Sequence, residues 1–316
     1  MIALRQDAER IYFLGVEVYA FGLYVCLGLA LALLVLGVLL RKRKWKSGTA
    51  ALTGVLSIGI GFVVSRLFFG FMDASLTETM PLWAMVRVNT GGYSMIGALL
   101  GACMGAVLTA RLTRQSAPAL LDLLAPALLL FIACERLGEG HIEEFGVSRK
   151  LTVDLPDNTF LVSGGRLNTY LLESFTALVL AIVMLWDLRG NRRAGNTFLL
   201  FLILFGASQV LMESLRKDGH MTVKAFVRLE MIMSMMLLGS GIIALFIRNL
   251  KRYPALSWAA LLTVLAAVGL GVLIEFKIDR SQISHYLLYL AFIAVLAVPV
   301  VLGLLLRKEE EKRGQA

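Results

Sequence analysis

The chain has 316 residues, of which 58% are hydrophobic and 17% are charged, and its mean hydropathy is +0.78. Soluble domains are nearer half apolar and a quarter charged, so this composition excludes an ordinary soluble domain and indicates an integral membrane protein. The net charge of +9 does not indicate a nucleic-acid partner. The basic residues lie in short segments between apolar runs, and the sequence carries no nucleic-acid-binding motif.

Nine apolar runs are long enough to cross a bilayer, since a spanning helix needs about 20 mainly apolar residues. They cover roughly residues 18–40, 50–72, 95–112, 118–136, 168–188, 196–216, 225–247, 256–275 and 285–306. The predicted fold class is therefore all-α, a polytopic bundle of about nine transmembrane helices.

Basic clusters follow the first, third, fifth, seventh and ninth runs, and the densest is Arg41-Lys42-Arg43-Lys44-Trp45-Lys46. Lys and Arg accumulate in the cytoplasmic loops of membrane proteins. We therefore expect the N-terminus outside and the C-terminus in the cytoplasm.

The third run contains glycines at every fourth position, Gly97, Gly101 and Gly105, which predicts a smooth helix face for close helix packing. The segment 151–165 alternates β-branched and polar residues around Pro156-Asp157-Asn158, a pattern that favours a short hairpin.

Three cysteines, Cys26, Cys103 and Cys134, each lie within an apolar run. They lack CxxC spacing, so we expect buried structural thiols rather than a disulfide framework or a metal site. No cofactor is expected.

The stretch Glu135-Arg136-Leu137-Gly138-Glu139-Gly140-His141-Ile142-Glu143-Glu144-Phe145-Gly146 directly follows the fourth apolar run. A charged side chain at the bilayer centre costs about 3 kcal/mol on insertion scales. A chain that leaves the membrane through so many ionisable residues is predicted to line a polar site or to reach the interface.

Further ionisable residues lie in or beside the outer halves of other runs, at Arg66, Glu173, Glu213 and Arg216. Glu213 and Arg216 are three residues apart and should share a helix face. Any one of these groups is as consistent with a structural ion pair, but together they indicate a buried polar pocket. Guanidinium groups bind phosphate through paired hydrogen bonds, so a phospholipid is the predicted ligand.

Six segments, in order along residues 18–247, resemble the prolipoprotein diacylglyceryl transferase family. They are Tyr19-Ala20-Phe21-Gly22-Leu23-Tyr24, Arg66-Leu67-Phe68-Phe69, Gly91-Gly92-Tyr93-Ser94-Met95-Ile96-Gly97, Asp122-Leu123-Leu124-Ala125-Pro126, Arg136-Leu137-Gly138, and the run from Gly206 to Asp218 that contains Glu213-Ser214-Leu215-Arg216. The sequence departs from the family pattern at Phe21, Ile96, Glu139 and Gln209.

The resemblance implies a transferase that moves a diacylglyceryl group from phosphatidylglycerol, or a related phospholipid, to the cysteine thiol of a lipoprotein precursor. It also implies a multi-pass protein of the bacterial cytoplasmic (inner) membrane, whose partners are that phospholipid and the precursor's signal segment. Residues that match the family's functional positions are Arg66, Arg136, Glu144, Gly146, Glu213 and Arg216.

Within this reading Arg136 is predicted to contact the phosphate and to be catalytic, with Arg66, Gly146, Glu213 and Arg216 binding the head group. A thiol needs a base, because the thiolate is the nucleophile. His141 is the hypothesised base, since it follows Arg136 closely and could replace the family histidine missing at Ile96. Glu144, with Glu139 and Glu143, is the alternative, and a solvated interfacial histidine is the simpler interpretation of His141.

Two other functions stay open at this point. A catalytically silent relative could bind phospholipid or lipoprotein precursors, which the four departures favour. A small-solute or lipid transporter is favoured by span number, although the intramembrane charges gather on one side. Residues 1–250 are predicted to form a seven-helix transferase-like domain, and 251–316 to add two helices and a basic cytoplasmic tail.

Overall fold

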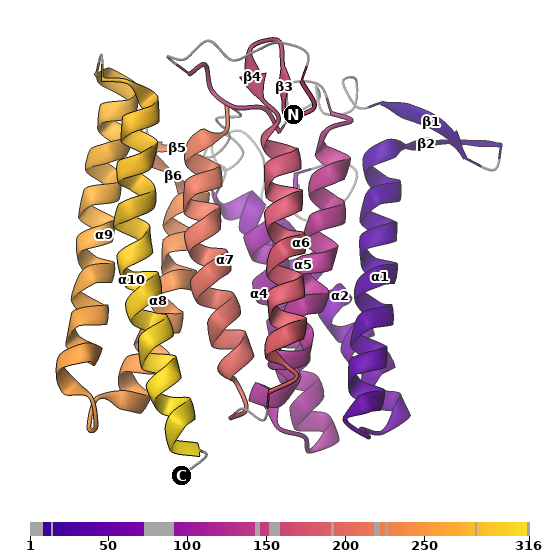
Figure 1. The fold of residues 1–316 in the computed structure, drawn as a ribbon. Coiled ribbons are helices and arrows are strands. Elements are labelled where there is room, and N and C mark those ends of the chain that lie inside the picture. The colour runs from indigo at the N-terminus through magenta and orange to yellow at the C-terminus, as the bar shows by residue number, and fades with distance from the viewer. Residues whose placement is uncertain are drawn as a thin grey trace. The chain divides into compact units, whose positions relative to one another are not determined.

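The computed structural model describes residues 9–13, 15–72, 92–142, 146–151, 159–190, 193–217, 222–224, 227–281 and 283–314. Within these ranges, nine helices are long and apolar enough to cross a membrane (Figure 1). They are α1 (Ala20–Lys42), α2 (Ser47–Met72), α4 (Met95–Thr113), α5 (Ala117–Glu139), α6 (Thr169–Asp187), α7 (Asn196–Leu215), α8 (Leu229–Asn249), α9 (Pro254–Arg280) and α10 (His285–Gly314). The predicted all-α class and the nine predicted spans are confirmed.

The chain divides into two compact units. The first comprises Met1–Gly146 and Tyr170–Leu185, and thus α1, α2, α4, α5 and most of α6. The second comprises Val147–Thr169 and Trp186–Ala316, and thus α7 to α10. The domain boundary predicted at residue 250 stays a prediction, as does the orientation across the membrane.

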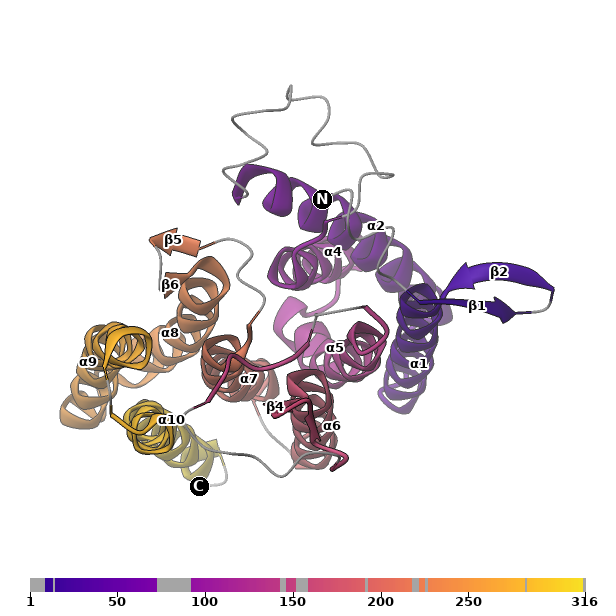
Figure 2. The ribbon, with the colours of Figure 1, turned by 90° about the horizontal axis from the view of Figure 1, so that it is seen from above.

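In the first unit α2 lies along α4, and α1 lies along α5 (Figure 2). The glycines of α4 explain the first of these contacts. A Cβ added at Gly101 would lie 2.7 Å from the Gly61 Cα, and one at Gly105 would lie 2.6 Å from the Ser57 Cα. The predicted glycine face is therefore confirmed as the surface on which α2 packs.

In the second unit α7 packs on α8, and α10 contacts α7, α8 and α9. The apolar core of this unit includes the fully buried side chains Ile203, Leu238, Ile242 and Phe292, drawn from α7, α8 and α10. The two helices beyond residue 250 therefore share a core with α7 and α8.

In the part of the chain that the structure describes, three two-stranded hairpins lie outside the helices, one before α1 and two between helices. They pair β1 (Arg10–Phe13) with β2 (Val16–Tyr19), β3 (Val162–Ser163) with β4 (Arg166–Leu167), and β5 (Thr222–Lys224) with β6 (Val227–Arg228). The β3–β4 turn is Gly164–Gly165, with φ of +56° and +69°, values that favour glycine. A hairpin is thus present near the end of the predicted segment, while residues 156–158, its predicted turn, lie outside the described residues.

The prediction of buried cysteines is wrong for Cys26, which is exposed, and only partly met by Cys103 and Cys134, which are half-buried. All three are free thiols. The apolar outer face of a membrane protein is in contact with lipid tails as apolar as its core. A cysteine in an apolar run can therefore face outward without cost.

Candidate functional site

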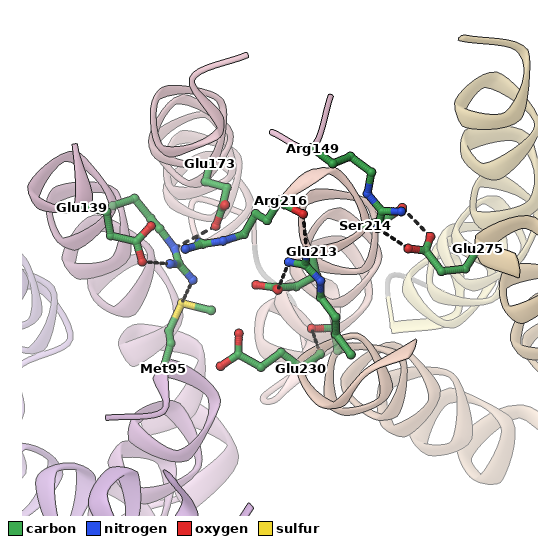
Figure 3. A network of polar contacts seen from close by, with 12 residues as sticks. Met95, Glu139, Arg149, Glu173, Glu213, Ser214, Arg216, Glu230 and Glu275 are labelled. Carbon is green, nitrogen blue, oxygen red and sulfur yellow. Dashed lines mark hydrogen bonds and ion pairs between the residues drawn. The ribbon is translucent and has the colours of Figure 1, made fainter. Parts of the chain in front are cut away.

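The first unit places Arg136 among three carboxylates at the end of α5. The Arg136 Nε lies 2.8 Å from Glu173 Oε2 on α6 and 3.6 Å from Glu135 Oε2, and Nη1 donates to Glu139 Oε1. The Arg136 side chain is 4% exposed and that of Glu173 is 0% exposed. Figure 3 shows Glu139 and Glu173 directed toward this guanidinium from two helices.

Local helix geometry produces this arrangement. Arg136 and Glu139 are three residues apart, so they share one face of α5. The Ser174 hydroxyl donates to the Ala133 carbonyl at 2.7 Å, which fixes α6 against α5 and presents Glu173 to Arg136. The structure therefore brings together Arg136 and Glu173, two of the sequence-predicted residues. It adds Glu139, which the sequence suggests as an alternative base and as a departure from the family pattern.

The remaining terminal nitrogen of Arg136 points to α4. Arg136 Nη2 lies 3.0 Å from the Met95 sulfur, also drawn in Figure 3. A thioether is a weak hydrogen-bond acceptor. A stronger acceptor, such as a phosphate oxygen, would therefore form a more favourable hydrogen bond with Nη2 than the Met95 sulfur does.

Arg66 of α2 holds the backbone just before α4. Its Nη1 donates to the Gly92 carbonyl at 2.7 Å, and its guanidinium carbon lies 5.7 Å and 5.8 Å from the Phe69 and Tyr93 ring centroids. Gly92 has φ +78°, and an added Cβ would lie 2.2 Å from the Phe69 ring. Arg66 thus orders the start of α4, which carries Met95.

His141 follows α5 and pairs with two groups from the N-terminal region. Its Nδ1 contacts the Glu9 carboxylate, and its Nε2 lies 3.4 Å from the Tyr24 hydroxyl. The His141 and Tyr24 rings stack at 5.2 Å, and the Glu9 amide donates to the His141 carbonyl at 2.9 Å. The histidine side chain is 32% exposed. It is therefore an oriented group rather than a freely solvated one.

Gly146 ends the first stretch of this unit in a conformation that favours glycine. Its φ is +65°, and an added Cβ would lie 2.7 Å from the Tyr170 Cβ. Its carbonyl accepts from the Tyr170 amide at 3.0 Å, at the start of α6. Its role is therefore to place α6 closely against the end of this segment. Glu144 lies outside the described residues.

The second unit contains Glu213 and Arg216. Glu213 is 3% exposed and Arg216 is 5% exposed. The prediction that they share a helix face is wrong, because α7 ends at Leu215 and Arg216 is extended, with ψ 147°. The extended backbone pairs with Ser148 in a β-bridge, which draws Arg216 out of the helix.

Several charged residues of the second unit were missed by the sequence analysis. Arg228 lies 3.8 Å from Glu213 and donates to the Arg216 carbonyl. Glu275 of α9 pairs with Arg149 and accepts from the Ser214 hydroxyl at 2.6 Å, as Figure 3 shows. Glu275 could have been noticed in the sequence. The apolar residues Phe276 and Ile278 follow it, which places the carboxylate inside a helix.

The described residues hold no group of three or more His, Cys, Asp or Glu side chains arranged to bind a metal ion. What the first unit offers is a buried guanidinium for an anion, and a histidine with a carboxylate on one ring nitrogen. These are the components of anion stabilisation and of proton transfer.

Comparison with known proteins identifies the relatives of this chain. A family model described as prolipoprotein diacylglyceryl transferase matches residues 10–247. Proteins named phosphatidylglycerol–prolipoprotein diacylglyceryl transferase are similar over most of the chain. The one from Bacillus velezensis is 26% identical over 246 residues, covering 75% of this chain and 90% of the relative. Those from Clostridium novyi and Listeria monocytogenes are each 26% identical, covering 75% and 78% of this chain and 94% and 92% of the relative. The chain belongs to the prolipoprotein diacylglyceryl transferase family.

Proposed function

We propose that this membrane protein transfers a diacylglyceryl group from phosphatidylglycerol to the cysteine thiol of a lipoprotein precursor, in the bacterial cytoplasmic membrane. The sulfur forms a bond to the glyceryl carbon that carries the phosphate. The carbon–oxygen bond to that phosphate breaks, glycerol phosphate leaves, and the thiol proton passes to a base. The family membership and the names of the relatives support this reaction.

The observation that carries the proposal is the guanidinium of Arg136, buried at the end of a membrane-spanning helix and held by Glu173 and Glu139. A fixed cation stabilises the charge that develops on a leaving phosphate without having to reorganise. We assign the phosphate to the Nη2 edge of Arg136, where it would replace the weak contact with the Met95 sulfur.

We propose that His141 is the base that accepts the thiol proton. A histidine acts as a base when one ring nitrogen is fixed and the other can accept a proton. Glu9 occupies Nδ1, while Nε2 is directed toward the Tyr24 hydroxyl at a longer separation of 3.4 Å. This carboxylate–histidine pair supports His141 over Glu144 as the proposed base.

The remaining proposed head-group residues have supporting roles. In the first unit, Arg66 acts on the segment before α4 and Gly146 allows the approach of Tyr170. In the second unit, Glu213 and Arg216 are buried at the end of α7. Their proposed contact with the head group follows from their match to the family positions.

A second candidate function has one specific observation in its favour. Glu139 stands where the family pattern has asparagine, and its carboxylate binds the Nη1 of Arg136. A carboxylate bound at Nη1 competes with a phosphate at the neighbouring Nη2 for the same guanidinium. A catalytically silent relative that binds precursor segments would tolerate this competition.

A complementation experiment distinguishes an active transferase from a catalytically silent relative. The parent chain and an Arg136→Ala variant are expressed in a bacterial strain depleted of its own transferase, with membrane insertion checked by blotting. Rescue by the parent but not by the variant is the expected result. Absence of rescue by a properly inserted parent would favour the silent relative.

A further inference from the structure

Glu275 is a fully buried carboxylate within a membrane-spanning helix, and it lies outside the part of the chain that matches the family. Its side chain is 0% exposed, and α9 runs from Pro254 to Arg280, whereas the family match ends at residue 247. Ionisable groups inside a membrane are costly and are retained where they serve a function or a partner. Glu275 therefore needs an explanation that the family fold does not supply.

Among the described residues, the partners of Glu275 belong to the second unit. One carboxylate oxygen contacts the Arg149 guanidinium, and the other accepts from the Ser214 hydroxyl at 2.6 Å. The next helix adds a third contact, since the Tyr289 hydroxyl of α10 donates to the Ser214 carbonyl at 3.0 Å. Glu275 of α9, drawn in Figure 3, and Tyr289 of α10 thus both bind Ser214 at the end of α7.

Ser214 lies between Glu213 and Arg216, two of the proposed head-group residues. The segment around them is further fixed by two backbone hydrogen bonds of 2.8 Å, from the Arg149 amide to the Leu215 carbonyl and from the Lys217 amide to the Val147 carbonyl. Arg149 therefore holds this segment through its amide and binds Glu275 through its side chain. Glu275 of α9 is thus linked to the end of α7 in two ways, by the Ser214 hydroxyl and through Arg149.

We propose that Glu275 is a positioning residue for the phospholipid head group, supplied by the two helices that this chain has beyond the family match. It acts through Ser214 and Arg149, which set the backbone that carries Glu213 and Arg216. Loss of its charge would loosen that backbone and weaken head-group binding, with a smaller effect on the chemical step. The proposal rests on the proposed function, because it takes Glu213 and Arg216 as head-group residues.

A second buried ion pair of the same unit provides a control. It distinguishes a role of Glu275 in head-group positioning from a general contribution to stability. Arg307 of α10 pairs with Asp187, whose carboxylate also accepts from the Thr197 hydroxyl at 2.8 Å at the start of α7. Asp187 is also buried, and it too joins α10 to α7 through a guanidinium and a hydroxyl. Asp187→Asn therefore removes an equivalent charge at the opposite end of α7.

The test compares Glu275→Gln, Asp187→Asn and the milder Tyr289→Phe with the parent, all purified as full chains in detergent. Two quantities are measured besides thermal stability. These are hydrogen exchange of peptides containing Arg149 and Lys217, and the KM and kcat for phosphatidylglycerol. Glu275→Gln should speed that exchange and raise KM about tenfold, the factor that corresponds to loss of one charge-assisted hydrogen bond.

Tyr289→Phe should also speed the exchange and raise KM, but by less than Glu275→Gln does. Asp187→Asn should change neither the exchange nor KM, even if it lowers thermal stability as much as Glu275→Gln does. Unchanged exchange in a folded Glu275→Gln or Tyr289→Phe protein would overturn the proposal, as would an equal rise of KM in Asp187→Asn. A parent that binds and transfers no phospholipid would overturn the proposed function instead. The exchange data would still decide whether Glu275 positions the end of α7.

Discussion

Arg136 of α5 and Glu173 of α6 form an ion pair of 2.8 Å in which neither side chain is appreciably exposed. Removal of one partner from a buried pair is strongly destabilising, because the other charge loses its compensation. The pair therefore fixes the orientation of the guanidinium before any substrate binds.

Glu139→Gln should strengthen phospholipid binding. The variant removes the charge at Nη1, which competes with a phosphate at the neighbouring Nη2 for the same guanidinium, but leaves Arg136 held by Glu173. We expect KM for phosphatidylglycerol to fall several-fold, about 1 kcal/mol, which is of the order of one hydrogen bond. Steady-state transfer kinetics measure it. Glu135→Gln is the control, since Glu135 lies 3.6 Å from Nε and leaves Nη1 unchanged. A collapse of activity in Glu139→Gln would show instead that this carboxylate takes part in the reaction.

His141→Ala should slow transfer by about 100-fold or more, the usual contribution of a general base. Glu9→Gln should slow it less, by about tenfold, because the histidine remains while its fixed orientation is lost. His285→Ala at the start of α10 is the control histidine and should leave the rate unchanged. The rates are measured with purified protein and a precursor peptide. Undiminished transfer by His141→Ala would exclude His141 as the base.

Gly146→Ala should lower the thermal stability in detergent more than Gly164→Ala does. Both glycines have positive φ, +65° and +56°, so alanine carries a backbone strain of about 1 kcal/mol at either position. At Gly146 the new Cβ would lie 2.7 Å from the Tyr170 Cβ, while at Gly164 it would have no atom of the described residues within 4 Å. Equal unfolding midpoints for the two variants would show that the close contact with Tyr170 adds nothing to the loss of stability.

Much of the fold could be predicted from the sequence because a membrane helix is defined by its length and apolar composition. The run predicted at 95–112 is α4, Met95–Thr113, and its glycines were correctly interpreted as a packing face. The ends of helices were harder to place, since they depend on tertiary contacts. Arg216 leaves α7 because its backbone pairs with Ser148, a residue 68 positions earlier in the chain.

The candidate site could be predicted only in part, for a related reason. Ionisable residues in apolar runs identified Arg136 and Glu173, whose cost in a membrane is visible in the sequence. Their partners from distant segments were not visible. Glu9 is 132 residues from His141, and Arg149 is 126 residues from Glu275. No periodicity relates positions so far apart, so these pairs required the folded chain.

Transfer by the purified protein tests the central claim most directly. The parent, Arg136→Lys and the control Arg248→Lys are incubated with phosphatidylglycerol and a cysteine-containing precursor peptide, and the lipid-modified peptide is quantified by mass spectrometry. Arg248 donates to Asn196 at 2.8 Å in the second unit and has no proposed role in the reaction.

The parent and Arg248→Lys should form the thioether-linked product. Arg136→Lys should form it about 100-fold more slowly, because lysine keeps the charge but loses the fixed donor geometry of the guanidinium. Absence of product from a folded parent, or an Arg136→Lys rate equal to that of the parent, would contradict the assignment of Arg136 to the phosphate.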